Sequence, residues 1–193
     1  MNENRYPEVV GLGGNSVDFL VPISRFPIPG EKFLLKNFEI EGGGVTATCL
    51  AQLSRLGEKV GWLGKVGDDK IKSLIQEICN RDNINLYEIS EKGSLSTFCW
   101  LFIDPTGEMV SYMFPNAALA LTPEEVEKEF DEIIRKSKIL FTDVCQVPLA
   151  PIIKGMEIAA GAGVLRFFDL DTLPMAPNSG IGSERELYNA FKL

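Results

Sequence analysis

Three consecutive glycines, Gly42–Gly44, constrain this chain more than any other feature, because they run directly into an apolar pattern of helical spacing. The apolar positions between Ala47 and Leu56 recur every three or four residues, and Gly57 supplies a stop. Glycines let a ligand lie against bare backbone, and the start of the helix beyond them offers unpaired N–H groups. A tight strand-to-helix loop without a ligand would use the same glycines. The run therefore predicts a strand–glycine–helix unit and leaves both interpretations open.

The composition excludes several classes of function. A length of 193 residues allows one domain with a substantial core, and 45% apolar with 24% charged residues is typical of a globular protein. The net charge of −8 provides no basic surface for a nucleic acid or an anionic membrane. The chain has no histidine, which excludes Ser-His-Asp, Cys-His and histidine general-base mechanisms. Acid–base chemistry would fall to carboxylates, lysine or water.

The cysteines predict neither a metal site nor a disulfide framework. They are spread singly through apolar segments, with no C-x-x-C pair and no histidine to complete a zinc site. We interpret them as buried free thiols in a reducing cytosol. The amino terminus is polar and no run of 18 apolar residues occurs, so neither a signal peptide nor a membrane span is expected. The prediction is a cytoplasmic protein, and the four cysteines are Cys49, Cys79, Cys99 and Cys145.

Strand and helix patterns alternate from Gly43 onward, which predicts a mostly parallel sheet with helices on both faces. An apolar run over 8–14 that ends in glycine predicts a buried first strand. Two extended segments follow, 17–23 and 33–40, and we expect them to form a small β flap. The capping box at Ser183 opens a last helix with no strand after it, so the sheet is expected to be incomplete at its carboxyl end.

The remaining patterns complete the expected order. Asp68 is expected to be the N-cap of a helix, with Asp69 favouring its dipole. Thr122 to Glu125 has capping-box spacing with proline at the first helical position. A hairpin over 97–114 turns at an Asp-Pro-Thr-Gly sequence and is a possible third part of the flap. Further strands are expected over 59–66, 85–89, 138–142 and 165–170, and a further helix over 148–160.

The order of these motifs resembles that of the ribokinase-like, or PfkB-type, carbohydrate kinases over essentially all 193 residues. The resemblance implies a three-layer α/β/α fold with a Rossmann-like sheet, a β flap that acts as a lid, and a single domain over 1–193 that is truncated. It also implies an ATP- and Mg²⁺-dependent kinase whose substrate is a sugar or a related alcohol. The matching pieces are the first strand with Asp18, Pro29-Gly30-Glu31, Gly43-Gly44 with Arg55-Leu56-Gly57, Gly64-Lys65-Val66-Gly67-Asp68-Asp69, Asp104-Pro105-Thr106-Gly107-Glu108 and Leu121-Thr122-Pro123.

The resemblance also implies substrate contacts. Asp18 would accept hydrogen bonds from substrate hydroxyls, which suits a carboxylate with two acceptor oxygens, although it could be a turn residue. Gly43 and Gly44 would let the sugar approach the backbone. Thr48 stands where the family usually carries a sugar-binding asparagine. Gln146 stands where some members carry a glutamate near the sugar, and it could equally be a loop residue.

These departures leave the substrate open, as a keto-sugar acid, a fructose-type sugar or a nucleoside. A further departure is Met109, where the family often has arginine after Gly-Glu.

The catalytic motifs of the family are a larger departure. Its N-x-x-E and G-A-G-D motifs stand later in its chains, and we find neither in that place here. The resemblance therefore implies that the catalytic aspartate lies beyond Leu193, the last residue of this sequence. Phosphoryl transfer needs positioned cations and donors around the developing charge. We expect the chain alone to be inactive, with no catalytic residue or metal ligand and with its ATP site largely absent.

Two other functions stay open. A non-catalytic module could bind a sugar or form a homodimer through the flap. A dinucleotide-binding oxidoreductase module is suggested by Gly11-Leu12-Gly13-Gly14, but the G-x-G-x-x-G pattern fails, because Ser16 replaces its last glycine and no helical pattern follows. A sugar kinase is the interpretation that accounts for more of the chain.

Overall fold

The computed structural model of the protein describes residues 5–171 and 182–193, with the elements in the order that the sequence predicts. The strands are β1 (Val9–Leu12), β2 (Ser16–Pro22), β3 (Glu39–Gly43), β4 (Val60–Val66), β5 (Asn85–Ser90), β6 (Phe98–Ile103), β7 (Met109–Phe114), β8 (Ile139–Asp143) and β9 (Leu165–Asp169). The helices are α1 (Val45–Arg55), α2 (Lys70–Arg81), the 3₁₀ turn η1 (Asn116–Ala120), α3 (Pro123–Glu125), the π turn η2 (Val126–Phe130), α4 (Asp131–Lys136), α5 (Leu149–Gly161) and α6 (Glu184–Ala190).

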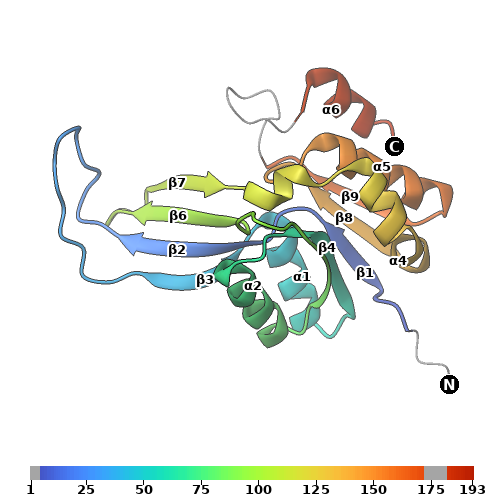
Figure 1. Ribbon diagram of the computed structural model, residues 1–193, viewed down its shortest axis with the longest axis horizontal. Coiled ribbons are helices and arrows are strands. Elements are labelled where there is room, and N and C mark those ends of the chain that lie inside the picture. The colour runs from blue at the N-terminus through green and yellow to red at the C-terminus, as the bar shows by residue number, and fades with distance from the viewer. Residues whose placement is uncertain (1–4, 172–181) are drawn as a thin grey trace.

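The body of the molecule is a five-stranded sheet of order β5-β4-β1-β8-β9, and every neighbouring pair of its strands is parallel. A second sheet, of order β3-β2-β6-β7, projects from the body (Figure 1). We call this second sheet the β flap. In it β2 pairs with β6 in parallel, whereas β3 and β7 are antiparallel to their neighbours. The predicted α/β class with a mostly parallel sheet is therefore confirmed.

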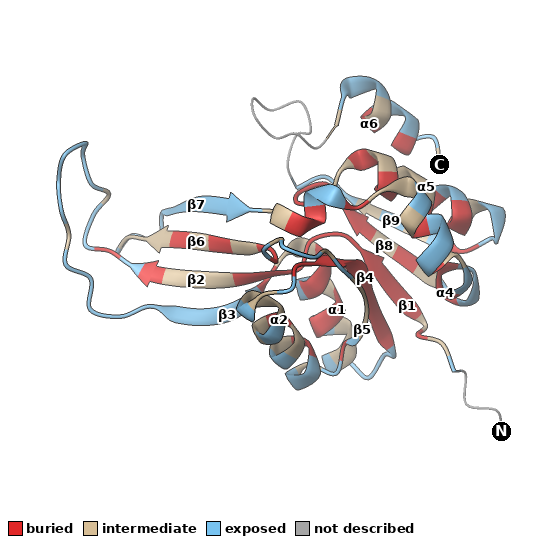
Figure 2. Ribbon diagram, viewed as in Figure 1, coloured by how far each residue is buried: buried red, intermediate tan, exposed pale blue. Residues whose placement is uncertain are grey.

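Two apolar clusters cover the two faces of the parallel sheet, because side chains along a strand point alternately to opposite faces. On one face Val10 and Leu12 pack in a cluster with residues of α4 and α5. On the other face Val9 and Trp62 pack with residues of α1 and α2. Figure 2 shows the buried positions concentrated in β1, β4 and β8, whereas β3 and β7 of the flap are exposed. The result is the expected three-layer α/β/α arrangement.

The second flap strand differs from its predicted position over 33–40. Strand β3 begins only at Glu39 and continues through Gly42 and Gly43, which pair with residues of β2. The pairing ends at Leu20 opposite Glu39, so the preceding residues have no partner strand and form an exposed loop. The prediction failed because apolar residues in this loop mimic a strand: Leu34 is fully exposed.

The cap of α2 also differs from the prediction. Asp69, not Asp68, is the N-cap residue, and its carboxylate accepts a hydrogen bond from the backbone N–H of Lys72 (3.1 Å). Asp68 instead accepts from the backbone N–H of Gly93 (3.0 Å) and holds the loop after β5. The two predicted capping boxes, at Thr122 and at Ser183, are present.

Strand β1 leads into β2 of the flap and not into a helix, so the structure lacks the strand–glycine–helix unit that a dinucleotide would require after Gly14. Among the described residues no helix is long and apolar enough to cross a membrane. No disulfide joins the four cysteines, and all of them are buried except the half-buried Cys49.

Strand β9 forms an open edge of the parallel sheet. Phe168 faces the cluster that α5 and α6 cover, whereas Leu165 and Phe167 on the opposite face are 55% and 50% exposed. Backbone groups of an edge strand are available for pairing with a further strand. Within the described residues this edge has no further strand beside it, and one face of β9 carries exposed apolar side chains.

Lys65, at the carboxyl end of β4, lies in a buried ion-pair cluster. Its ammonium group contacts Glu91 (2.7 Å) and Glu125 (2.8 Å) and donates to the carbonyl of Ala120 (3.0 Å), which uses all three N–H donors. The side chain is only 4% exposed. Burial lowers the pKa of Lys65, but the hydrogen bonds and charges of Glu125 and Glu91 outweigh burial and raise this pKa above its ordinary value of 10.5.

We expect Lys65→Met to lower the free energy of unfolding by about 2 kcal/mol at pH 8, less than for a fully buried pair, because both glutamates can regain water. A raised pKa means that the stabilisation is complete below pH 10.5 and is lost as the pH rises through the native pKa of Lys65. Urea unfolding of both proteins at pH 8 and pH 11 measures this difference. A difference that does not shrink at pH 11 would contradict the assignment.

Candidate functional site

The carboxylate of Asp18 lies directly against the backbone of Gly43, on the neighbouring flap strand. A Cβ atom at Gly43 would overlap all three atoms of that carboxyl group. The Oδ1 atom of Asp18 accepts a hydrogen bond from the hydroxyl of Ser16 (2.8 Å). Burial raises the pKa of Asp18 and the hydrogen bond from Ser16 opposes this shift. The structure therefore brings together two of the predicted site residues, and a side chain at position 43 would displace the carboxylate of Asp18.

Gly44 joins the flap to α1 and lies against the end of β1. It is the N-cap residue of α1, with φ of 87° and ψ of 133°, a conformation that only glycine adopts without strain. A Cβ atom at Gly44 would lie 2.5 Å from the carbonyl carbon of Gly14 and 2.7 Å from the amide nitrogen of Asn15. We call this contact between Gly14 and Gly44 the glycine seam.

Asp143, the last residue of β8, caps α1 from a distant part of the sequence. Gly44 provides no side chain for the cap, and the Oδ2 atom of Asp143 accepts the backbone N–H of Thr46 instead (3.1 Å). The same oxygen accepts the backbone N–H of Gly14 (2.8 Å) and the hydroxyl of Thr46. One carboxylate thus joins the ends of β1 and β8 to the start of α1.

Asp143 is fully buried, and burial raises its pKa against the three hydrogen bonds that favour the ionised form. Nearby Asp171 raises this pKa further. The second oxygen, Oδ1, has no hydrogen-bond partner among the described residues. Gln146, which is 3% exposed, also lies close to Gly14, because its Oε1 atom would be 3.0 Å from a Cβ atom there. This Oε1 atom is likewise buried without a hydrogen-bond partner among the described residues. Two unused acceptor oxygens therefore border the glycine seam.

Three backbone amides at the start of α1 donate to protein oxygens and are not available to a ligand. The N–H of Thr46 is bonded to Asp143, that of Ala47 to the carbonyl of Gly14 (3.0 Å), and that of Thr48 to the carbonyl of Gly44 (2.9 Å). Three of the backbone N–H groups at the start of α1 are therefore satisfied by the protein itself.

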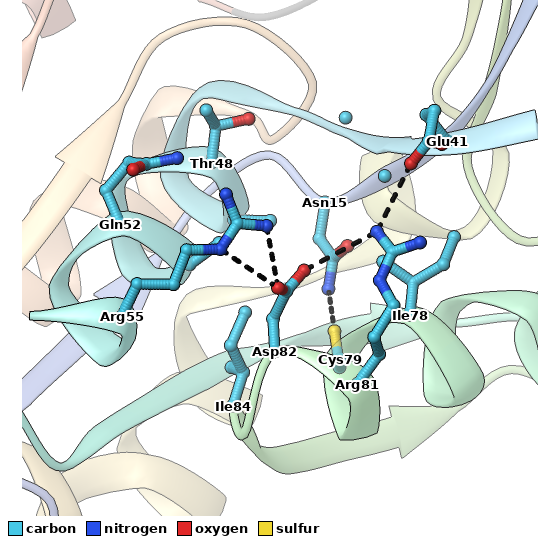
Figure 3. Close-up of a pocket in the computed structure, with 14 residues that line it drawn as sticks. Asn15, Glu41, Thr48, Gln52, Arg55, Ile78, Cys79, Arg81, Asp82 and Ile84 are labelled. Atoms are coloured by element: carbon cyan, nitrogen blue, oxygen red, sulfur yellow. Dashed lines mark hydrogen bonds and ion pairs between the residues drawn. The ribbon is translucent and has the colours of Figure 1, made fainter. Parts of the chain in front are cut away.

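Thr48 does not share a cavity with Asp18 or Gln146. It is exposed, and it lines a cavity of about 150 Å³ between β3, α1 and α2 that Figure 3 shows. Gly43 also lines this cavity, but Asp18 and Gln146 do not. The structure thus places Asp18, Gly43, Gly44 and Gln146 along the seam and puts Thr48 on the rim of a neighbouring cavity.

A chain of ion pairs lies beside this cavity (Figure 3). Arg55 of α1 contacts Asp82 (2.7 Å), and Arg81 of α2 contacts both Asp82 (3.6 Å) and Glu41 (3.2 Å). Both arginines are about half exposed. The pair between Arg81 and Glu41 links the body of the molecule to strand β3 of the flap. Deeper in the cavity, the amide of Asn15 contacts the sulfur of Cys79 (3.5 Å).

Sequence reasoning missed Asp143 and Thr46, although a polar residue at the carboxyl end of a predicted parallel strand is a signal for a site. The pattern N-x-x-E does match at one place in the sequence, Asn85–Glu88, well before the position where the family carries this motif. It lies in β5, at the sheet edge opposite β9, where Asn85 donates to the carbonyl of Val60 (3.2 Å) and Glu88 pairs with Lys72 (2.9 Å). In the described part of the chain no three His, Cys, Asp or Glu side chains could hold a metal ion together.

The family resemblance predicts a catalytic aspartate beyond Leu193, and no described residue tests this prediction. Leu193 itself follows α6, and its backbone N–H donates to the carbonyl of Ala190 (3.2 Å). Its half-buried side chain packs against the apolar cluster that contains Val10 and Leu12. Position 193 thus belongs to the packed body of the molecule and is not part of the glycine seam.

Comparison with known proteins identifies the family. The model of the pfkB family carbohydrate kinases matches residues 9–171. Fructokinase-2 of Solanum lycopersicum is 26% identical over 89% of this chain and 52% of its own length, and a 5-dehydro-2-deoxygluconokinase of Clostridium perfringens is 25% identical over 88% and 51%. An Arabidopsis thaliana ribokinase, solved in complex with ribose and ATP, superposes with a TM-score of 0.78 and 23% identity over 96% of this chain and 62% of its own. The chain spans about half the length of the curated relatives that it matches, and it belongs to the pfkB family of carbohydrate kinases.

Proposed function

We propose that this chain is the substrate-binding part of an ATP-dependent sugar kinase, with the sugar held at the glycine seam beneath the β flap. The observation that carries the proposal is the carboxylate of Asp18 packed across Gly43, next to the contact of Gly44 with Gly14. A half-buried carboxylate suits a small polyhydroxy ligand, since each of its oxygens can accept a hydrogen bond from a hydroxyl group. The fructokinase and the ribokinase among the relatives support a sugar as the ligand.

The proposed roles follow the geometry. Asp18 accepts hydrogen bonds from sugar hydroxyls, and Gly43 leaves room for its carboxylate. Gln146 contributes a second polar contact from the end of β8, and the flap excludes water when it closes. Thr48 would reach the sugar only from the rim of the neighbouring cavity.

The proposal assigns phosphoryl transfer to residues outside this chain, with the catalytic aspartate beyond Leu193. ATP and Mg²⁺ would bind to the rest of a longer protein, which would pack against the open edge at β9 and its exposed apolar side chains, Leu165 and Phe167. The chain itself would form one folded unit over 1–193, which binds and orients the sugar and forms no ADP alone. Mg²⁺ would neutralise charge on the transferred phosphoryl group when it is bound.

Asp18→Asn tests the proposed sugar contact. We expect the gene product of the source cells to form ADP only when a neutral sugar is present. Asp18→Asn should lower its kcat/KM about 100-fold, because a charge-assisted hydrogen bond to the sugar becomes a neutral one. A coupled assay with fructose, ribose and other sugars measures this. Glu39→Gln, on the exposed face of the same flap, is the matched control and should leave kcat/KM unchanged.

The outcomes separate the parts of the proposal. Absence of sugar-dependent ADP formation across the panel would contradict the kinase assignment. A loss below threefold in the Asp18→Asn protein would instead remove Asp18 from the site. ADP formation by the 193-residue chain alone would contradict the assignment of the chemistry to other residues.

A second function, self-association through the flap, is favoured by exposed apolar side chains on its outer strands. Val110, Tyr112 and Phe114, which share one face of β7, and Phe38 just before β3 are each between 39% and 57% exposed. Apolar patches of this kind mark interaction sites. We expect sedimentation equilibrium to find a dimer that Tyr112→Glu dissociates, and a monomer at all concentrations would refute this function.

A further inference from the structure

The pairing of β2 with β3 places a second carboxylate beside Asp18. In this antiparallel pair Asp18 lies directly opposite Glu41. Residues in opposite positions share one face of the sheet, with Cβ atoms about 5 Å apart. The next position on that face of β3 is Gly43, where a Cβ atom would overlap the carboxyl group of Asp18. Like charges in opposite positions are unfavourable, so the strand pairing alone predicts repulsion between Asp18 and Glu41.

Arg81, the last residue of α2, directs the carboxylate of Glu41 away from Asp18. Its Nη2 atom donates to Oε2 of Glu41 (3.2 Å), and Figure 3 shows this contact. Because β3 is the edge strand of the flap, the long side chain of Glu41 can bend around that edge toward α2. The helix is close at this point, since a Cβ atom at Gly42 would lie 2.6 Å from the side chain of Ile78. One carboxylate therefore pairs with α2, and the other stays against Gly43.

Glu41 is the neighbour that could change the charge around Asp18 near neutral pH. Burial raises the pKa of Asp18, and the hydrogen bond from Ser16 lowers it. The strand pairing places two titratable side chains beside Asp18, Glu41 on β3 and Cys99 on β6. Burial and the charge of Asp18 raise the pKa of the Cys99 thiol to about 11, so this thiol is uncharged below that pH. The position of the Glu41 carboxylate thus decides whether Asp18 has a charged neighbour.

We propose that Arg81 is a positioning residue for the site at Asp18, because it holds Glu41 against α2 and so keeps a second negative charge away from Asp18. The inference rests on the proposed function, in which Asp18 meets the sugar as an ionised carboxylate, and it adds a residue of the body that maintains this state. Without Arg81 the carboxylate of Glu41 is free to turn toward its partner on β2. Asp18 then binds a proton more tightly, since two adjacent negative charges repel each other.

Arg81→Met tests the inference through the titration of Asp18 itself. NMR of the aspartate-labelled gene product of the source cells follows that carboxyl group, and Asp18→Asn identifies its resonance. We expect Asp18 to bind its proton about tenfold more tightly in the Arg81→Met protein, because Glu41 is partly exposed and water screens the repulsion. Arg81→Lys retains the positive charge and should keep most of the wild-type behaviour. Arg135→Met, which removes a half-exposed arginine paired with Asp131 on α4, is the matched control and should change nothing at Asp18.

A second substitution separates the charge from a loss of structure. Arg81→Met and Glu41→Gln combined remove both charges and should restore the wild-type titration of Asp18. Structural damage from the loss of Arg81 would not be repaired in this way. Glu41→Gln alone leaves the arginine without its partner on the flap, so Asp18 should bind its proton less tightly than in the wild type. This variant decides the inference even if the Arg81→Met protein does not fold.

The pH dependence of sugar phosphorylation gives an independent measurement. A tighter proton on Asp18 means that its ionised form is lost at a higher pH as the pH falls. The acid limb of kcat/KM for the sugar should therefore move to higher pH in the Arg81→Met protein. It should return to its wild-type position when Glu41→Gln is added.

The results distinguish the inference from the proposed function. An unchanged titration of Asp18 in both the Arg81→Met and the Glu41→Gln proteins would overturn the inference. A tighter proton that persists in the doubly substituted protein would also overturn it, since the effect would not pass through Glu41. The expected titrations in a gene product that forms no ADP with any sugar would support the inference and contradict the kinase function.

Discussion

Gly44→Ala is expected to destabilise the protein by about 4 kcal/mol or more, because two separate penalties add. An L-residue at φ of 87° and ψ of 133° is strained, and the added methyl group would lie 2.5 Å from the backbone of Gly14. Backbone atoms cannot turn away as a flexible side chain can. The seam must therefore open, and sugar binding should be lost together with stability. Urea unfolding measures the free energy, and calorimetry measures the binding.

Gly57→Ala is the matched control at the other end of α1. Gly57 also has a positive φ, 98°, but a Cβ atom there would meet no atom within 4 Å. Its substitution should cost about 1 kcal/mol, from backbone strain alone. The difference between the two variants isolates the contact across the seam. If both cost the same, the backbone of Gly14 does not constrain position 44.

Asp143→Ala is expected to lower the free energy of unfolding by about 3 kcal/mol, since three buried donors lose their acceptor at once. These donors are the amides of Gly14 and Thr46 and the hydroxyl of Thr46. Asp143→Asn retains one acceptor oxygen and should cost less than half as much. Urea unfolding of the three proteins at pH 7 measures these differences, and a loss below about 1 kcal/mol in the alanine variant would show that the cap does not stabilise the fold.

The pH dependence of Asp143 has a definite sign. Because burial raises its native pKa above the ordinary 3.8, the folded state binds the proton more tightly than the unfolded state does. The contribution of Asp143 to the free energy of unfolding is therefore most favourable below pH 3.8, and it decreases as the pH rises through the native pKa of Asp143. Relative to the non-titrating Asp143→Asn protein, the wild type should gain stability as the pH falls from 7 to 4. A constant difference would place the native pKa at its ordinary value.

Much of the fold could be predicted from the sequence, because local patterns specify it. Periodicity of two or 3.6 predicted the strands and helices of the body, and the capping boxes at Thr122 and Ser183 marked two helix starts. The prediction failed where local sequence was ambiguous. The apolar residues around Leu34 imitate a strand although no partner strand reaches them, and either of two adjacent aspartates could cap α2.

The site could be predicted only in part, because its construction depends on contacts between distant residues. The resemblance to the kinase family identified Asp18, Gly43 and Gly44, and the structure brings them to one place. No local pattern shows that Asp143 would use the N–H of Thr46, or that Thr48 would lie on the rim of a separate cavity. An acceptor atom without a hydrogen-bond partner among the described residues, such as Oδ1 of Asp143, can be identified only from the three-dimensional structure.

The remote cap of α1 has a consequence for synthesis of the protein on the ribosome. Asp143 follows its partner Thr46 by 97 positions in the sequence, and it follows its partner Gly14 by 129 positions. A nascent chain that contains Asp18 and all the glycines of the seam therefore still lacks the carboxylate that holds them together. The contacts of Asp143 can form only after β8 has left the exit tunnel, so premature termination before that strand would yield a product with Asp18 and the glycines of the seam but without the remote cap of α1.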